Sequence, residues 1–353
     1  MADPARPWRD RALVQLTLVR IREFLREPEA VFWTFLFPVL MAAGLGIAFR
    51  SRPEAPSRIA VLTGAPAAGS AASRLEASPL LEVQLLDDSA AARELRTGRI
   101  ALVVVPHSEA SMEYRFDDTR PEGIAARRLV DDVLQRAAGR TDPILVGEIR
   151  LQEPGSRYID FVIPGLLGMN LLGSGIWGIG FSVVDARRKR LLKRLVATPM
   201  PKAAYLASFV ISRLALLVVE AGLLLIFGVL AFGVPMRGSF GTLFIICLTG
   251  ALAFGGLGLL IAARPKTIEG ASGLMNLAMV PMWVFSGVFF SSSRFPQVIQ
   301  PFVQALPLTA VNDALRANML EGASLAQVAP ELAIVAAWLV VCFAVALRIF
   351  RWQ

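Results

Sequence analysis

The sequence predicts a polytopic α-helical membrane protein with six transmembrane helices and an α/β extracytoplasmic domain inserted between helices 1 and 2. The chain has 353 residues, of which 55% are hydrophobic and only 18% are charged, and its mean hydropathy is +0.57. The apolar residues gather into runs of about 20 or more, the length that a helix needs to cross a hydrocarbon core roughly 30 Å thick. One long polar segment, residues 50–157, follows the first run. This pattern argues against a soluble protein.

Six apolar runs define the predicted spans. They cover residues 30–49, 159–184, 204–232, 240–263, 272–290 and 330–347. Pro38, Pro164 and Pro281 lie in the interior of these runs. Such prolines are tolerated in membrane helices because neighbouring helices satisfy the freed backbone groups. We therefore expect kinks and close helix contacts there.

The basic residues predict how the chain crosses the membrane. They are concentrated before the first span, between the second and third, between the fourth and fifth, and after the sixth, which are all segments on the same side. Basic residues near span ends stay in the cytoplasm, whereas long loops are translocated largely regardless of their charge. Both termini are therefore predicted to be cytoplasmic and residues 50–157 to lie outside. No nucleic acid is expected as a partner, although the pI is about 10.3, because the charges follow the topology.

The segment 50–157 has the alternating pattern of a small α/β domain. Strands are predicted at residues 58–62, 81–86, 100–105 and 112–116, and helices near residues 67–77, 90–95 and 122–136. The one histidine, His107, has no cysteine or second histidine nearby, so we expect an exposed loop residue and no metal site. Cys247 and Cys342 both lie inside apolar runs, so we expect packing residues and no disulfide in this domain.

Two amphipathic segments are predicted on the cytoplasmic side. The first, residues 8–27 within an N-terminal segment 1–29, alternates apolar side chains with arginines, as helices at a membrane surface do. It is either an anchor for the first span or a lever that contacts a cytoplasmic partner. The second, residues 185–198, adds a leucine stripe to its basic residues and either docks on a partner protein or only fixes the topology. Its candidate coupling residues are Arg187, Arg188, Lys189, Arg190, Leu191, Leu192, Lys193, Arg194, Leu195 and the terminating Pro199.

Polar residues inside the spans are candidates for a transport path. Arg213 and Glu220 lie two helical turns apart and therefore share a face. Charges in a span are costly and usually point to a protein-lined interior. Arg213 is near enough to the cytoplasmic end to snorkel, whereas Glu220 lies deeper. A polar contact between helices and a substrate path both remain open for this pair and for Asn276.

The segment 291–329 is too apolar for an ordinary loop and too often interrupted by proline for a span. We expect short helices that dip into the outer leaflet and cap a cavity between the spans, because non-helical backbone at that depth needs protein or water around it.

Several catalytic motifs are absent from the sequence. The phosphate-binding loop Gly-x-x-x-x-Gly-Lys-Ser/Thr does not occur, and the four lysines lack its context. A nucleophile elbow, a zinc-spaced histidine pair and an intramembrane carboxylate pair are also missing. We expect neither enzymatic activity nor a bound cofactor on this chain.

Two stretches resemble the permease subunits of ABC-2 type ABC transporters, in the variety with a large external domain after the first span. The first is Leu-Leu-Lys-Arg-Leu-Val-Ala-Thr-Pro-Met at residues 191–200. The second is Pro-Met-Trp-Val-Phe-Ser-Gly-Val-Phe-Phe at residues 281–290, which continues into Ala-Leu-Pro-Leu-Thr-Ala-Val-Asn-Asp-Ala-Leu-Arg at residues 305–316. The resemblance covers nearly the whole chain.

The resemblance implies roles for several segments. Residues 185–198 would be a coupling helix seated in a cleft of the ATPase, residues 8–27 an interface helix, and residues 294–316 part of an outer gate. Many members carry Gly-Thr-x-Glu in the coupling stretch, where this chain has Arg190, Leu191 and Lys193. A basic contact would then replace an acidic one. The candidate gate residues are Phe289, Phe290, Phe295 and Pro307.

The resemblance also implies partners and a location. ATP and Mg would be bound by a separate pair of ABC ATPase subunits, and a second permease, identical or a paralogue, would complete the path. Membrane lipid and a periplasmic adaptor are further expected partners in the bacterial inner membrane. The chain would export an amphipathic, drug-like or lipid-like substrate. The alternative is a sensor whose external domain binds a ligand.

Overall fold

The computed structural model describes residues 12–49, 56–141, 143–144, 155–188, 202–265 and 267–349. The chain divides into two compact units. One comprises Met1–Arg50 and Gln152–Gln353, and the other Ser51–Leu151. The first is the membrane unit and the second the α/β unit.

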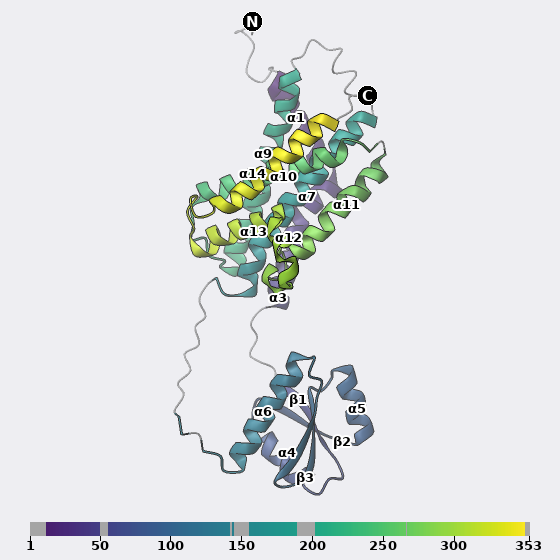
Figure 1. Ribbon diagram of the computed structural model, residues 1–353, viewed down its shortest axis with the longest axis vertical. Coiled ribbons are helices and arrows are strands. Elements are labelled where there is room, and N and C mark those ends of the chain that lie inside the picture. The colour runs from purple at the N-terminus through teal and green to yellow at the C-terminus, as the bar shows by residue number, and fades with distance from the viewer. Residues whose placement is uncertain are drawn as a thin grey trace. The chain divides into compact units, whose positions relative to one another are not determined.

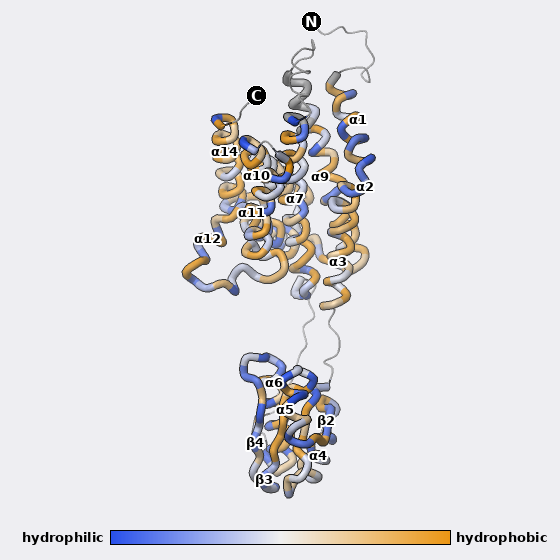
Figure 2. Tube along the Cα trace, turned by 90° about the vertical axis from the view of Figure 1, so that its right-hand side faces the viewer, coloured by the Kyte–Doolittle hydropathy of each residue, from blue (hydrophilic) through white to orange (hydrophobic). Residues whose placement is uncertain are grey.

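Five helical stretches of the described residues are long and apolar enough to cross a membrane. They are Pro28–Ala48, Tyr158–Asp185, Ile211–Phe232, Phe240–Ala262 and Ala329–Ile349. The first consists of α2 (Pro28–Val31), the π-helical turn η2 (Phe32–Leu36) and α3 (Phe37–Ala48). The others belong to α7 (Tyr158–Arg188), α9 (Lys202–Phe232), α10 (Phe240–Ala262) and α14 (Ala329–Ile349). Figure 2, which colours the Cα trace by residue hydropathy, shows that hydrophobic residues predominate in the helices of this unit.

The fifth predicted span differs from the helix found there. The sequence predicts helix over residues 272–290, but α11 extends over Ile268–Phe285 and is not among the five stretches above. Gly287 has a φ of +69°, a left-handed conformation that stops the helix. Residues 286–290 are therefore a turn, and six transmembrane helices remain a prediction.

Helix α7 is the centre of the membrane unit. It packs against α3, α9, α10, α11 and α13 (Pro307–Arg316), and Figure 1 shows it among these helices. In the 18-residue stretch of α7 that is most suited to cross a membrane, 78% is buried inside the protein. The corresponding share is 17% in Pro28–Ala48 and in Ala329–Ile349. A Cβ on Gly258 of α10 would lie only 2.8 Å from the carbonyl oxygen of Ile176. Small residues thus let the α7 and α10 backbones approach closely, as is common between membrane helices.

Short helices follow α11, where the sequence predicts interrupted helical structure. They are the 3₁₀ turns η3 (Ser292–Arg294) and η4 (Gln297–Ile299), then α12 (Gln300–Ala305), α13 and the π-helical turn η5 (Ala317–Glu321). Pro301 and Pro307 stand in the first turns of α12 and α13, where a missing backbone N–H costs nothing. The depth of this segment in a membrane remains a prediction.

The α/β unit contains a four-stranded sheet in the order β2-β1-β3-β4. Strand β1 (Ser57–Leu62) is parallel to β2 (Leu81–Leu86) and to β3 (Leu102–Ser108), and β4 (Ser111–Arg115) is antiparallel to β3. Helices α4 (Ala68–Glu76) and α6 (Pro121–Ala137) bury one face, and α5 (Asp88–Thr97) covers the other. All seven elements overlap the predicted ones. Whether this unit lies outside the membrane remains a prediction.

His107 is exposed as predicted, but it does not lie in a loop. It is part of β3, and its Nε2 lies 3.2 Å from Glu113 Oε2 on β4. The sequence interpretation was wrong because Pro106 suggests a strand end, whereas β3 continues through it with an irregular register to β4.

Tyr114 on β4 gives the α/β unit a spectroscopic probe, since it is the one tyrosine between residues 51 and 151. Its hydroxyl donates to Asp131 Oδ1 at 3.3 Å. Burial, followed by the negative charge of Asp131, raises the pKa of Tyr114 to about 12. The folded state therefore holds this proton more tightly than the unfolded chain does. The resulting stabilisation is present below the ordinary tyrosine pKa of about 10 and is lost as the pH rises to about 12.

We predict that the isolated segment 51–151 shows one tyrosine ionisation near pH 12, measured by absorbance at about 295 nm. In denaturant the transition should return to about pH 10. The variant Asp131→Asn should lower the folded-state pKa, because the nearby negative charge is removed. A native transition at the denatured value would contradict the buried position of Tyr114.

Candidate functional site

A buried ion pair lies within α9. Arg213 Nη1 is 3.2 Å from Glu220 Oε1, and Arg213 Nη2 donates to Glu220 Oε2 at 3.2 Å. The Glu220 side chain is fully buried and that of Arg213 is 14% exposed. The shared face predicted from their spacing is confirmed. The expectation that Arg213 snorkels is wrong, because its guanidinium points along the helix to the carboxylate.

The pair faces small residues of α7. Ser174 lies beside the Glu220 carboxylate, and a Cβ on Gly178 would lie 3.7 Å from Arg213 Nη1. Two charged side chains therefore fill space that small α7 residues leave open. Asn276 is exposed on α11, which packs against α7, α10 and α13.

A second polar cluster holds the turn that follows α11. Three carbonyl oxygens of this turn accept hydrogen bonds from side chains of other helices. Asn312 Nδ2 donates to Ser286 at 2.8 Å, Arg316 Nη2 donates to Gly287, and the Tyr158 hydroxyl donates to Phe289 at 2.9 Å. We call Tyr158, Asn312 and Arg316 the carbonyl clamp. It provides the donors that non-helical backbone needs in an apolar environment.

Arg316 makes the most contacts within the clamp. Its guanidinium carbon lies 3.7 Å from the centre of the Phe161 ring, and its Nε and Nη2 both lie 3.4 Å from the Phe161 carbonyl oxygen. Asp313, one turn earlier on α13, is 3.5 Å from Nη1. The side chain is only 12% exposed. One cation therefore joins α7, α13 and the turn after α11.

Two glycines of α7 make room for the clamp. A Cβ on Gly165 would lie 2.5 Å from the Val288 carbonyl oxygen, and one on Gly168 would overlap Asn312 Oδ1. Neither position is compatible with a real side chain. The turn and α13 can contact α7 only because these positions lack one.

Two of the predicted gate residues, Phe289 and Phe290, belong to this turn. Phe295 is 5.7 Å from Phe290 and 5.1 Å from Phe285, measured between ring centres. Phe289 contributes the carbonyl bound by Tyr158, and Pro307 is buried at the start of α13. Sequence reasoning did not single out the clamp. An arginine and an asparagine in an apolar segment, each costly to bury, were the available signal.

The predicted coupling segment is described only at its start. Helix α7 continues through Arg188, so residues 185–188 are its last turn and do not begin a separate helix. The other candidates fall outside the described residues: Lys189, Arg190, Leu191, Leu192, Lys193, Arg194, Leu195 and Pro199. Helix α9 begins at Lys202. In the chain, the segment therefore links the end of α7 to the start of α9.

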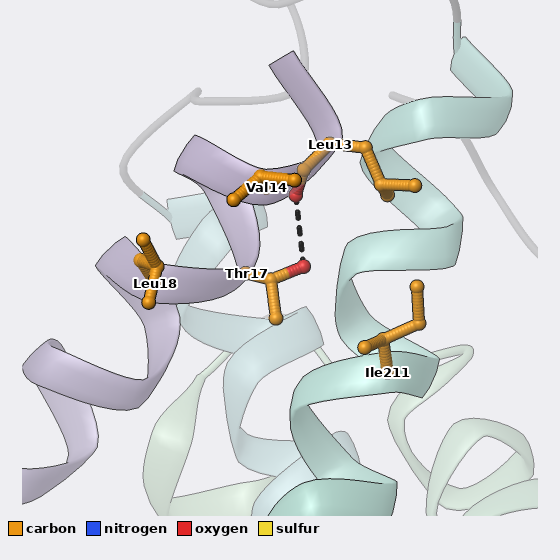
Figure 3. A pocket seen from close by; sticks show the side chains of 5 residues that line it. All are labelled: Leu13, Val14, Thr17, Leu18 and Ile211. Atoms are coloured by element: carbon orange, nitrogen blue, oxygen red, sulfur yellow. Dashed lines mark hydrogen bonds between the residues drawn. The ribbon is translucent and has the colours of Figure 1, made fainter. Parts of the chain in front are cut away.

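Helix α1 (Ala12–Leu25) packs against α9. Arg20 Nε donates to Ser208 Oγ at 3.1 Å. An apolar groove between the two helices is lined by Leu13, Val14, Thr17, Leu18 and Ile211 (Figure 3). The Thr17 hydroxyl donates to the Leu13 carbonyl at 2.8 Å, so its polar atom is satisfied within α1. Among the described residues, no cluster of three or more His, Cys, Asp or Glu side chains could hold a metal ion.

We predict that Glu220→Gln destabilises the protein by roughly 3–5 kcal/mol, because it leaves a buried guanidinium without its counter-charge. The double variant Arg213→Met/Glu220→Met should recover most of that loss, since neither charge is then buried. Thermal unfolding in detergent measures both. If the single and double variants lost equal amounts of unfolding free energy, the unpaired guanidinium would not be the cause of the destabilisation.

Replacing Arg316 by lysine tests the clamp. Lysine keeps the charge but loses the planar fork and the stacking on Phe161, so we expect a loss of about 2 kcal/mol in unfolding free energy. The control is Arg294→Lys at an exposed position in η3, which should change stability little. An Arg316→Lys protein as stable as this control would show that the charge alone suffices.

Comparison with known proteins identifies the family. The profile described as "ABC-2 family transporter protein" matches residues 29–348. ABC transporter G family member 20 of Dictyostelium discoideum is 29% identical over 174 residues, which are 49% of this chain and 24% of that protein. Inner membrane transport permease YadH of Escherichia coli (strain K12) is 26% identical over 156 residues, 43% of this chain and 57% of the relative. Linearmycin resistance permease protein LnrN of Bacillus subtilis (strain 168) is 24% identical over 174 residues, 49% and 45% of the two chains.

The chain thus spans between about a quarter and three fifths of the length of these relatives. The family profile, in contrast, extends over nearly all of it, from the start of the first apolar helix to the end of the last. The chain belongs to the ABC-2 family of transporter proteins.

Proposed function

We propose that this chain is the membrane permease subunit of an ATP-binding-cassette exporter and that a separate pair of ATPase subunits drives it. ATP and Mg are bound by those ATPase subunits. The permease works with a second copy of itself or a paralogue in the bacterial inner membrane. Both termini are cytoplasmic and the α/β unit is extracytoplasmic.

The main support for this proposal is that the predicted coupling segment joins α7 to α9, and that α9 in turn is bonded to α1. In the chain, helices α7 and α9 are joined by the basic, leucine-containing stretch 189–201. Helix α1 is attached to α9 through the hydrogen bond from Arg20 to Ser208. A push on the coupling stretch therefore acts on the most buried span and, through α9, on the amphipathic N-terminal helix.

The turn after α11 is proposed to belong to the outer gate. Its conformation depends on the carbonyl clamp, whose donors come from α7 and α13. A tilt of α7 would change the positions of Tyr158 and Phe161 relative to this turn. Movement begun at the cytoplasmic end of α7 would thereby open a path near Phe290 and Phe295.

The proposed substrate is amphipathic, drug-like or lipid-like and leaves the cytoplasm or the inner leaflet. A permease that is 24% identical is named for linearmycin resistance, which is compatible with export of an amphipathic compound. Glu220 and Arg213 are proposed to hold α9 against α7, since the two charges are paired within the protein. Lipid and a periplasmic adaptor are further proposed partners.

We predict that Leu192→Asp/Leu195→Asp abolishes stimulation of the co-purifying ATPase, because the leucine stripe would no longer fit an apolar cleft. The measurement is ATP hydrolysis by the complex purified from its native membrane. The matched control is Leu85→Asp on β2, where the leucine is 53% exposed, and it should leave stimulation intact.

Unchanged stimulation in the double variant would rule out residues 185–198 as the coupling element. Recovery of a kinase or cyclase in place of an ATPase would favour the sensor alternative.

A further inference from the structure

The first membrane helix is interrupted by a π-helical turn, and Pro38 accounts for this interruption. Pro38 lacks a backbone N–H, and in a continuous α-helix that group would bond to the carbonyl of Thr34. The chain forms the π-helical turn η2 over Phe32–Leu36 at this place, where the N–H of Phe37 bonds to the Phe32 carbonyl. Proline and π turns are both established sites of helix bending.

The Thr34 carbonyl, which in a continuous α-helix would face the missing N–H of Pro38, is bound by a side chain of another helix. Asn170 of α7 donates from Nδ2 to the Thr34 oxygen at 3.2 Å. Asn170 is only 7% exposed although it is polar. Burying this amide would be unfavourable without a partner. Its side chain thus supplies from α7 a hydrogen bond at the place where Pro38 cannot donate one.

The same turn also contacts α1. The rings of Phe24 on α1 and Phe35 in η2 meet edge to face with 5.9 Å between their centres. Four residues earlier on α1, Arg20 binds Ser208 of α9. The π turn therefore lies between α1 on one side and α7 on the other.

We propose that Pro38 and Asn170 form a hinge that sets the angle between α3 and α2, to which α1 is joined, with Asn170 as the positioning residue. One neutral hydrogen bond between helices holds the hinge, and such a bond is weak enough to be exchanged during a movement. Contacts of this chain alone define the hinge. Its use in transmitting movement from the ATPase to α7 rests on the proposed function.

The test is a distance measurement across the hinge in the full chain, without nucleotide or ATPase. Nitroxide labels at Arg22→Cys on α1 and Gly44→Cys on α3, both exposed positions, are compared by pulsed electron paramagnetic resonance. The background carries Cys247→Ala and Cys342→Ala, which removes the natural thiols. Asn170→Leu keeps the side-chain size but removes the donor, and we expect it to broaden the distance distribution.

Adding Pro38→Ala to Asn170→Leu should narrow the distribution again, because an alanine at this position restores a backbone N–H for the Thr34 carbonyl. The matched control, Pro281→Ala with Asn170→Leu, removes a proline from α11 and should leave the distribution broad. An unchanged distribution in Asn170→Leu, or a broadening that Pro38→Ala does not reverse, would overturn the hinge.

Pro38→Ala alone provides a second measurement if Asn170→Leu does not fold. It should shift the mean distance, since a continuous helix replaces the π turn, and a distribution identical to that of the parent would also overturn the proposal. These outcomes are independent of ATP hydrolysis. A hinge without any stimulated ATPase would therefore refute the proposed function and leave the hinge intact.

Discussion

The need to satisfy backbone carbonyls in an apolar environment determines how the membrane unit is built. Wherever the chain departs from regular helix between apolar helices, an unpaired carbonyl would cost several kcal/mol in a hydrocarbon environment. The carbonyl of Thr34 is met by Asn170, and those of Ser286, Gly287 and Phe289 are met by Asn312, Arg316 and Tyr158. Every one of these donors lies on α7 or on α13, which packs against α7. Among the described residues, these four irregular carbonyls are thus bound by the central helix α7 and by one helix that packs against it.

Helix α7 can contact five other helices because its sequence combines hydrogen-bond donors with residues that have little or no side chain. Gly165 and Gly168 admit the turn and Asn312, while Ser174 and Gly178 face the charged pair of α9. Gly165 and Gly168 make room for the carbonyl clamp, and Ser174 and Gly178 make room for the ion pair. A movement of α7 would consequently affect both polar sites at once.

The sequence predicted regular elements well and tertiary pairings poorly. The length of the apolar run was sufficient to predict α10, and the alternation of strand-like and helix-like stretches was sufficient to predict the strands of the α/β unit. Both signals depend on local composition. The predicted end of α11 was wrong, since residues 286–290 are as apolar as a span although they form a turn. The shared face of Arg213 and Glu220 could be predicted because both residues lie on one helix. Asn170 and Thr34 are 136 residues apart, and no local pattern indicates that they meet.

The ring contact between Phe49 and Tyr158 has a consequence for how this protein could evolve. Their centres are 4.2 Å apart, so the end of α3 and the start of α7 lie next to each other. The α/β unit is inserted between these two points, which contact each other directly through the two rings. A short loop could replace it without changing the register of any span. Descendants of one ancestral permease could therefore gain, lose or exchange such a domain while their membrane helices stay the same.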